Sequence, residues 1–255
     1  MTEVEWRNLT AEELRRRAAA GALAILPVAS TEQHGPHLAT GVDDVLCSEV
    51  CRRAGRMLSE RGVPAVVAPT LWVGLAEHHV AFGGSFTLTL PTYHAVLRDL
   101  CRSILRAGFG KIVIVNGHGG NMSALNALTT DLTRELDAPV ATTTYFLLAE
   151  EAFAEILEDQ SAVLHACEAE TSMMMALRPD LVREGRLAEA FGGRGGESAR
   201  SVLSPPIHRW RSFTEITPTG VIGDARRASA EKGERLTQAA AAGLAETLAA
   251  GAPWA

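Results

Sequence analysis

The stretch "LAILPVASTEQHGPHLATGVDD" (residues 23–44) joins an apolar run to a dense polar segment. Residues 23–29 have the composition of a buried strand, and the polar segment that follows holds three carboxylates, two imidazoles, two glycines and a proline. In open α/β sheets, ligands bind just beyond the carboxyl ends of the strands. A surface loop can carry any of these residues singly, but their density directly after a strand predicts a functional site.

The rest of the chain alternates short β-rich runs with longer helical runs. The expected strands are 23–29, 65–71, 86–90, 111–117 and 139–146. The expected helices are 11–20, 44–60, 92–107, 121–136, 147–158, 168–177 and 226–250, with Thr92 as the N-cap of the third and Gly108 just beyond its end. This alternation predicts βαβ units, and near-continuous apolar strands are typical of a parallel sheet covered on both faces. Because no repeat or linker divides the chain, we predict a single α/β domain over residues 1–255.

Composition excludes several classes of protein. Of the 255 residues, 47% are hydrophobic and 21% charged, and the formal charge of −6 argues against binding to nucleic acid or an anionic membrane. No apolar run approaches the roughly 18 residues of a transmembrane helix, and the charged N-terminus lacks the apolar core of a signal peptide. The four cysteines show no CxxC spacing, so we expect them to be reduced and mostly buried (Cys47, Cys51, Cys101 and Cys167). We expect a cytoplasmic protein with no nucleic-acid or membrane partner.

Three polar clusters fall at or near the predicted strand ends. They are Glu32, His34, His37, Asp43 and Asp44; "NGHGGN" (116–121); and "HACEAETS" (165–172). Each also has a structural interpretation. Asp43 or Asp44 could cap a helix, and "NGHGGN" could be a tight turn or a phosphate-binding loop. Three such clusters at strand ends favour one shared site.

Helical phase distinguishes the two glutamates of the third cluster. Counting from Glu170, positions i+3, i+4 and i+7 are Met173, Met174 and Leu177, so Glu170 lies on the apolar face of its helix. Glu168 is about 200° away around the helix and should face another way, to solvent or to a position behind the site. A buried carboxylate is unstable unless it is paired or bound to a metal. Glu170 therefore needs a cation.

The motifs together resemble one known family. "PVASTEQHGPHLATGVDD", "VNGHGGN", "HACEAETS" and "ITPTGVIGD" follow one another as in the creatininase family of binuclear metal amidohydrolases, and the similarity runs from about residue 23 to 240. The resemblance implies a three-layer α/β/α sandwich and two divalent metal ions per chain. These would be Zn²⁺ or Mn²⁺, with Fe²⁺ as a further candidate. It also implies a homo-oligomer, commonly a hexamer.

The resemblance also assigns site residues. The implied metal ligands are Glu32, His34, Asp43, which would bridge both ions, and His118. Creatininase has a further glutamate ligand two positions after the histidine of "NGH", where this chain has Gly120. We infer that Glu170 supplies the missing carboxylate. Ser161 and Ala76 stand where creatininase has a tryptophan that encloses creatinine and a substrate-binding serine, so we expect the creatinine pocket to be absent.

The expected reaction is hydrolysis of a small-molecule amide by a hydroxide that bridges the two ions. The substrate would be a small cyclic amide, a formamide or a short peptide. His165 matches the catalytic histidine of the family and would protonate the leaving nitrogen. The expected substrate pocket contains His79, Gly119 and Gly120, with His79 as a pocket residue and His78 facing elsewhere.

Two other functions remain open from the sequence. One is a cysteine hydrolase that uses Cys167 beside His165. The other is a non-catalytic metal-binding or regulatory protein of the same fold. Residues 191–206, rich in Gly, Ser and Pro, are either a lid over the site or a surface loop.

Overall fold

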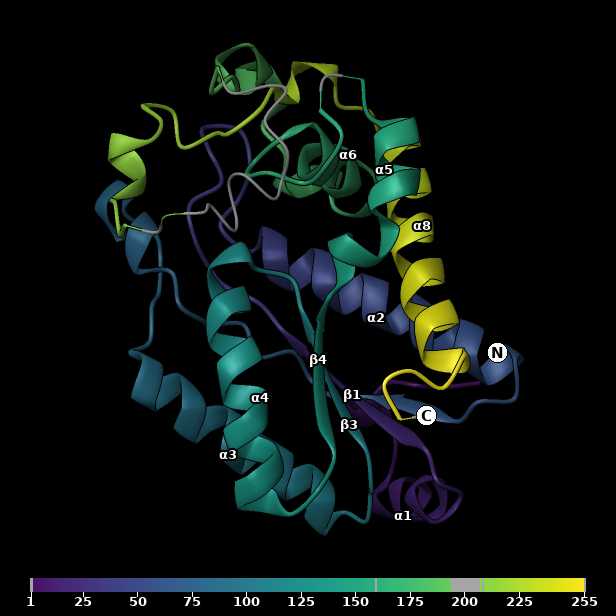
Figure 1. The fold of residues 1–255 in the computed structure, drawn as a ribbon. Helices are drawn as coiled ribbons and strands as arrows, with labels where there is room; N and C mark the ends of the chain where they lie inside the picture. Colours follow the sequence, from purple (N-terminus) through teal and green to yellow (C-terminus); the bar gives the residue numbers. More distant parts are fainter. Residues whose placement is uncertain (1, 159, 194–206, 208, 255) are drawn as a thin grey trace.

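The computed structural model describes residues 2–158, 160–193, 207 and 209–254. Its centre is a sheet of four parallel strands in the order β2-β1-β3-β4 (Figure 1). The strands are β1 (Leu23–Val28), β2 (Ala65–Val67), β3 (Ile112–Asn116) and β4 (Val140–Thr144). The predicted α/β fold with a parallel sheet is confirmed.

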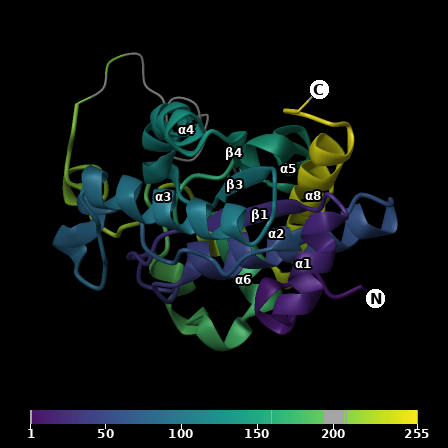
Figure 2. The same ribbon diagram turned by 90° about the horizontal axis from the view of Figure 1, so that it is seen from below.

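Alternate strand residues face two separate cores, as the twofold period of a strand requires. In β3, Ile112 and Ile114 pack on one face of the sheet, and Val113 and Val115 pack on the other. The first face is covered by α1 (Ala11–Ala19), α3 (Leu90–Arg106) and α4 (Met122–Leu136). The second is covered by α2 (Val42–Glu60), α5 (Glu150–Ile156), α6 (Glu168–Leu177) and α8 (Ala230–Ala249). Figures 1 and 2 show the resulting three layers.

Five of the expected helices begin at other residues, among them α3, α2 and α8. α3 starts at Leu90, and its N-cap is Thr89, whose hydroxyl accepts a hydrogen bond from the Thr92 N–H. Pro91 is thus in the first turn, where the missing N–H costs nothing. α2 starts at Val42 after Gly41, so neither Asp43 nor Asp44 is the N-cap. α8 starts at Ala230, four residues later than expected, after the N-cap Ser229.

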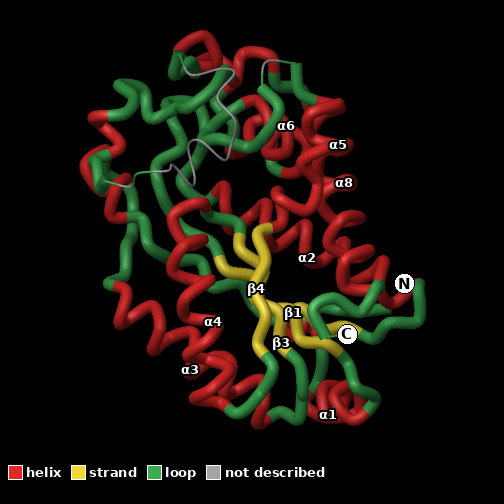
Figure 3. The backbone as a smooth tube through the Cα atoms, in the orientation of Figure 1, coloured by secondary structure: helices red, strands yellow, loops and turns green. Residues whose placement is uncertain are grey.

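The predicted strand at 86–90 is wrong. Residues 86–89 belong to no helix or strand and Leu90 begins α3, so the segment pairs with no strand among the described residues (Figure 3). The Phe86 N–H instead donates to Thr31 O, and the Leu88 N–H donates to Gly74 O. The segment therefore joins the loop after β1 to the loop after β2. Its β-like composition reflects backbone pairing with loops, which the sequence pattern cannot distinguish from pairing in a sheet.

Other sequence expectations have simpler outcomes. All four cysteines are buried and free of disulfides, as predicted. Within the part of the chain that the structure describes, no helix is long and apolar enough to cross a membrane. Most of the 191–206 segment, which was expected to be either a lid or a surface loop, lies outside the described residues.

Two contacts hold α6 against α8. The Lys232 Nζ lies 2.6 Å from Glu168 Oε1, an ion pair whose carboxylate is fully buried. One residue further along, Gly233 packs so closely on α6 that a β-carbon there would overlap the Ser172 carbonyl. Both contacts position the helix that carries Glu170.

We predict that Gly233→Ala destabilises the protein by about 1–3 kcal/mol, because the methyl group must push α8 away from the α6 backbone. Intrinsic helix propensity alone would favour alanine by about 1 kcal/mol, so the two effects have opposite signs. Urea unfolding measures the difference. Gly185→Ala is the control, since a β-carbon at Gly185 has no neighbour within 4 Å. A Gly233→Ala protein as stable as the wild type would contradict the close packing.

Candidate metal centre

Five carboxylate and imidazole side chains from four parts of the fold meet beyond the carboxyl ends of the strands. The contributing elements are the loop after β1, the first turn of α2, the turn after β3 and the first turn of α6. The side chains are Glu32 and His34, Asp43, His118, and Glu170, none more than 5% exposed. The structure thus brings together every residue proposed as a metal ligand.

Asp43 lies at the centre of this cluster. Its Oδ1 is 3.2 Å from His34 Nε2, and its Oδ2 is 3.2 Å from His118 Nδ1. His34 Nε2 is also 3.9 Å from Glu170 Oε1, and His118 Nδ1 is 3.1 Å from Glu32 Oε2. The side chains therefore form two groups that could each hold a metal ion, Glu32–Asp43–His118 and His34–Asp43–Glu170. Asp43 is common to both.

Backbone carbonyls orient the two imidazoles. His34 Nδ1 lies 3.1 Å from Glu32 O, and His118 Nε2 lies 3.3 Å from Leu75 O. Because a carbonyl only accepts, each of these nitrogens carries the hydrogen, and the opposite nitrogen of each ring can bind a metal. His34 Nε2, Glu32 Oε2 and Asp43 Oδ2 are buried and have no hydrogen-bond partner among the described residues. Imidazole nitrogen and carboxylate oxygen suit Zn²⁺ or Mn²⁺, so the residues present fit such ions.

The electrostatics of the centre favour positive charge. Burial alone would lower the pKa of His34, but the Asp43 carboxylate outweighs it and raises the pKa to about 9. Burial would raise the pKa of Glu32, but His118 and His79 hold it well below its usual range. Burial raises the pKa of Glu170 to about 7, against the opposing effect of His34. In the absence of a metal, protons supply the positive charge that the carboxylates require.

The "NGHGGN" turn is built by its two asparagines. Asn116 Oδ1 accepts from the His118 N–H at 3.1 Å, and its Nδ2 donates to His118 O at 2.7 Å. Asn121 Oδ1 accepts from the Leu75 N–H at 3.0 Å. A β-carbon at Gly120 would overlap the His118 ring and lie 2.6 Å from Leu75 O. No side chain fits there, so the carboxylate of the second group comes from Glu170.

Two further imidazoles adjoin Glu32. His79 Nε2 is 3.2 Å from Glu32 Oε1, and His165 Nδ1 is 3.6 Å from the same oxygen. His165 also belongs to a third group that could hold a metal, with Glu32 and His34. Burial lowers the pKa of His165 well below its usual value, which keeps the ring neutral. His78, expected to face elsewhere, also lines the pocket, with its ring centroid 4.2 Å from that of His79.

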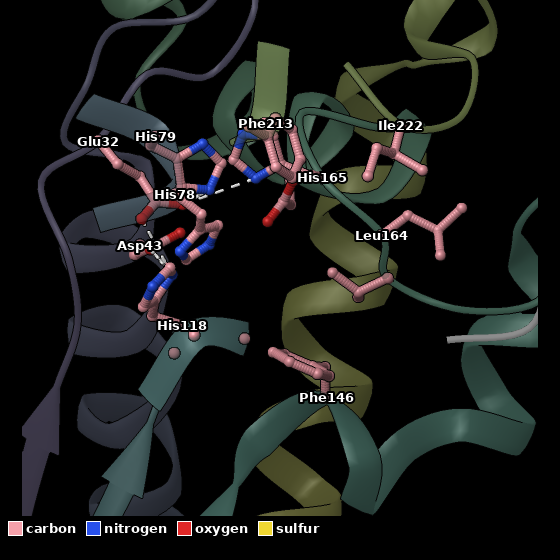
Figure 4. Close-up of a pocket in the computed structure, with 15 residues that line it drawn as sticks. Glu32, Asp43, His78, His79, His118, Phe146, Leu164, His165, Phe213 and Ile222 are labelled. Atoms are coloured by element: carbon pink, nitrogen blue, oxygen red, sulfur yellow. Dashed lines mark ion pairs between the residues drawn. The ribbon is translucent and has the colours of Figure 1, made fainter. Parts of the chain in front are cut away.

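The pocket has one polar and one apolar side. Figure 4 shows Glu32, Asp43 and His118 facing Phe146, Leu164 and Ile222 across it. Its volume is about 60 Å³. Gly119 and Gly120 line it as proposed, and no Lys or Arg does so among the described residues.

Sequence reasoning missed two residues of the site. The Phe213 ring lies 4.2 Å from the His79 ring and 4.9 Å from the His165 ring, centroid to centroid. No sequence pattern marked it. Gln33 Nε2 lies within 3.0 Å of both His79 Nδ1 and His165 Nε2. Its position in the sequence between two predicted metal ligands, Glu32 and His34, could have marked Gln33 as a site residue.

Two expectations need correction. Glu168, for which exposure to solvent was one option, is completely buried and paired with Lys232, because α8 covers that face of α6. Cys167 is buried too, and burial raises the pKa of its thiol to about 12. A nucleophilic cysteine requires a lowered pKa, so the cysteine-hydrolase interpretation is not supported.

Comparisons with known proteins agree with this geometry. A family model described as creatininase, creatinine amidohydrolase, matches residues 7–248. The creatinine amidohydrolase of Pseudomonas putida is 30% identical over 260 residues, which cover 94% of each chain. The mycofactocin precursor peptide peptidase of Mycolicibacterium smegmatis is 30% identical over 218 residues, 84% of this chain and 79% of the relative. A crystal structure of creatininase aligns over 99% of both chains with a TM-score of 0.82 and 27% identity. The chain belongs to the creatininase family.

This family comprises hydrolases, and similar solved structures include a manganese form of creatininase and a mutant in a zinc form. The manganese form aligns with a TM-score of 0.81 and 26% identity. The buried groups of this chain could hold such ions.

We predict opposite outcomes for the two glutamates of α6. Glu170→Gln removes a charge from the His34–Asp43–Glu170 group, so it should lower metal occupancy and turnover while the fold persists. Glu168→Gln breaks a buried ion pair with Lys232 and should destabilise the protein by about 1–3 kcal/mol with metal content retained. Elemental analysis and thermal unfolding of both variants test this. A metal-poor Glu168→Gln protein beside a metal-replete Glu170→Gln protein would reverse the assignment.

Proposed function

We propose that this protein is a binuclear metal-dependent amidohydrolase. The observation that carries the proposal is the position of Asp43, whose two oxygens face two different groups of potential ligands. Glu32 and His118 would complete one site, and His34 and Glu170 the other. Three buried atoms without hydrogen-bond partners, His34 Nε2, Glu32 Oε2 and Asp43 Oδ2, belong to residues of these groups, as expected of atoms that bind an ion.

Two Zn²⁺ or Mn²⁺ ions bound there, with Fe²⁺ as an alternative, would lower the pKa of a shared water and polarise the amide carbonyl. The protein residues would position these partners. Asp43 would hold the ions at a fixed separation. The backbone N–H groups of the turn at Gly119 and Gly120 border the same pocket and are placed to help hold the developing oxyanion.

His165 is the proposed proton carrier. Its ring borders the pocket, and its Nδ1 lies on the side of Glu32, where the attacking water and the leaving nitrogen would meet. A neutral imidazole there can accept the proton of the water and return it to the leaving nitrogen. The Phe213 ring makes a T-shaped contact with the His165 ring, at 4.9 Å between the ring centroids.

The proposed substrate is an uncharged amide with an apolar group beside the scissile bond. Phe146, Leu164 and Ile222 lie opposite the polar cluster (Figure 4), and Val163 also lines the pocket. A formamide, a small cyclic amide or a short peptide has this chemistry. The relatives named as a creatinine amidohydrolase and a peptide peptidase support this range.

We further propose a cytoplasmic homo-oligomer, with a hexamer as the expected form. Trp72 and Phe86 are exposed and in edge-to-face contact at 5.4 Å, and Leu90 is half exposed. Exposed large apolar side chains of this kind are typical of an interface. Light scattering of the purified protein would test the assembly.

We predict that the purified protein binds two divalent ions per chain and that Asp43→Ala loses most of both. The reason is that Asp43 serves both groups, whereas Glu170 serves one. Elemental analysis after dialysis measures occupancy, and Asp44→Ala is the matched control because Asp44 belongs to neither group. Full occupancy in the Asp43→Ala protein would contradict a shared ligand. Two ions bound without hydrolysis of any amide would support a non-catalytic role instead.

We predict that creatinine is a poor substrate. Ser161 is exposed and Ala76 fully buried, and neither lines the pocket. Loss of a stacking partner and a hydrogen bond should cost a few kcal/mol in the transition state, or roughly several hundred-fold in rate. Turnover of creatinine is to be compared with that of N-formyl amines and of short peptides with apolar side chains. Efficient conversion of creatinine would show that the pocket recognises this ring through other residues.

A further inference from the structure

The side-chain amide of Gln33 lies between two histidines of the site. Its Nε2 is 2.9 Å from His79 Nδ1 and 3.0 Å from His165 Nε2. The residue is buried. Nothing in the proposed metal centre uses Gln33 as a ligand.

Backbone groups fix the orientation of this amide. The Gly35 N–H donates to Gln33 Oε1 at 2.9 Å, and Gly220 O accepts from Gln33 Nε2 at 3.2 Å. A backbone N–H can only donate and a carbonyl can only accept, so the amide oxygen and nitrogen cannot exchange places. Gly220 has a φ of +76°, and a β-carbon there would overlap Gln33 Oε1. Gly220, the first glycine of the "ITPTGVIGD" motif, thus makes room for the Gln33 side chain.

A count of the available hydrogens then determines which ring nitrogen of each histidine carries its hydrogen. The amide nitrogen has two hydrogens but three neighbours, which are His79 Nδ1, His165 Nε2 and Gly220 O. His165 Nε2 also lies 2.9 Å from the main-chain oxygen of Gln33. All groups are satisfied in one assignment: Gln33 donates to His79 and Gly220, and His165 Nε2–H donates to Gln33 O. Any other assignment leaves a buried carbonyl unpaired or sets the N–H of His79 against the N–H of Gln33, which proteins rarely tolerate.

We propose that Gln33 is a positioning residue that sets the tautomers of His79 and His165. His79 then carries its hydrogen on Nε2, which donates to Glu32 Oε1 at 3.2 Å and leaves Glu32 Oε2 for an ion. His165 carries its hydrogen on Nε2 and presents the Nδ1 lone pair to the pocket. This inference rests on the proposed function, since a proton carrier must begin with a free nitrogen facing the reacting water.

The direct test is nitrogen NMR of the zinc-loaded protein labelled with ¹⁵N-histidine, in which the shifts of Nδ1 and Nε2 report the tautomer. His79→Gln and His165→Gln variants assign the signals. We expect the hydrogen on Nε2 in both rings. A hydrogen on Nδ1 of His79 in the wild-type protein would overturn the proposal without any variant of Gln33.

Gln33→Leu removes the amide at similar volume. We expect the His79 signals to become those of a tautomer mixture and kcat to fall by about 10–100-fold, with zinc content and KM nearly unchanged. Gln33→Glu replaces the donor by an acceptor and should move the His79 hydrogen to Nδ1. Unaltered His79 tautomers in both variants would refute the role of Gln33, whatever happens to activity.

Gln160→Leu is the matched control. Gln160 is also buried and donates to a carbonyl, Ala162 O at 2.6 Å, but it contacts neither His79 nor His165. The substitution should lower stability without changing the histidine spectrum. If the wild-type tautomers are as proposed but no amide is hydrolysed, the proposed function fails while the role of Gln33 in placing the hydrogens stands.

Discussion

Buried negative charge is the constraint on which this structure depends. Glu32, Asp43 and Glu170 lie together inside the protein, and ring nitrogens of His34 and His118 face them. Such a cluster is stable only with positive charge among its members, supplied by protons or by metal ions. The parallel sheet makes the arrangement possible, because the loops after β1 and β3 leave the sheet at the same edge. Because each proposed ligand must reach the same small volume, the elements around it need rigid support.

Different parts of the scaffold supply that rigidity in different ways. Asn116 and Asn121 hold the His118 turn through backbone hydrogen bonds. α6 is held from behind by α8, through the Glu168–Lys232 ion pair and the close approach at Gly233. The segment at 86–90 joins the loops after β1 and β2. None of these groups is a proposed ligand, yet each fixes an element that carries one.

Much of this fold could be predicted from the sequence, because apolar runs and helical phase are local signals. The parallel sheet followed from its continuous strands, and the burial of Glu170 followed from its spacing to Met173 and Met174. The failures concern partners distant in sequence. The 86–90 segment has strand composition but pairs with loops, and Glu168 is buried by a helix some 60 residues later. Gln33 could not be assigned a role, because the two histidines it contacts come from other loops.

Gly120 has a consequence for the relation between this chain and creatininase. The backbone at that position approaches His118 and Leu75 O so closely that even a methyl group is excluded. Grafting a glutamate there would therefore displace His118, which is itself a proposed ligand. The proposed carboxylate ligand on α6 thus accompanies a turn after β3 that has no room for a side chain at Gly120. In this chain, a glutamate at position 120 would also require the turn that carries His118 to move.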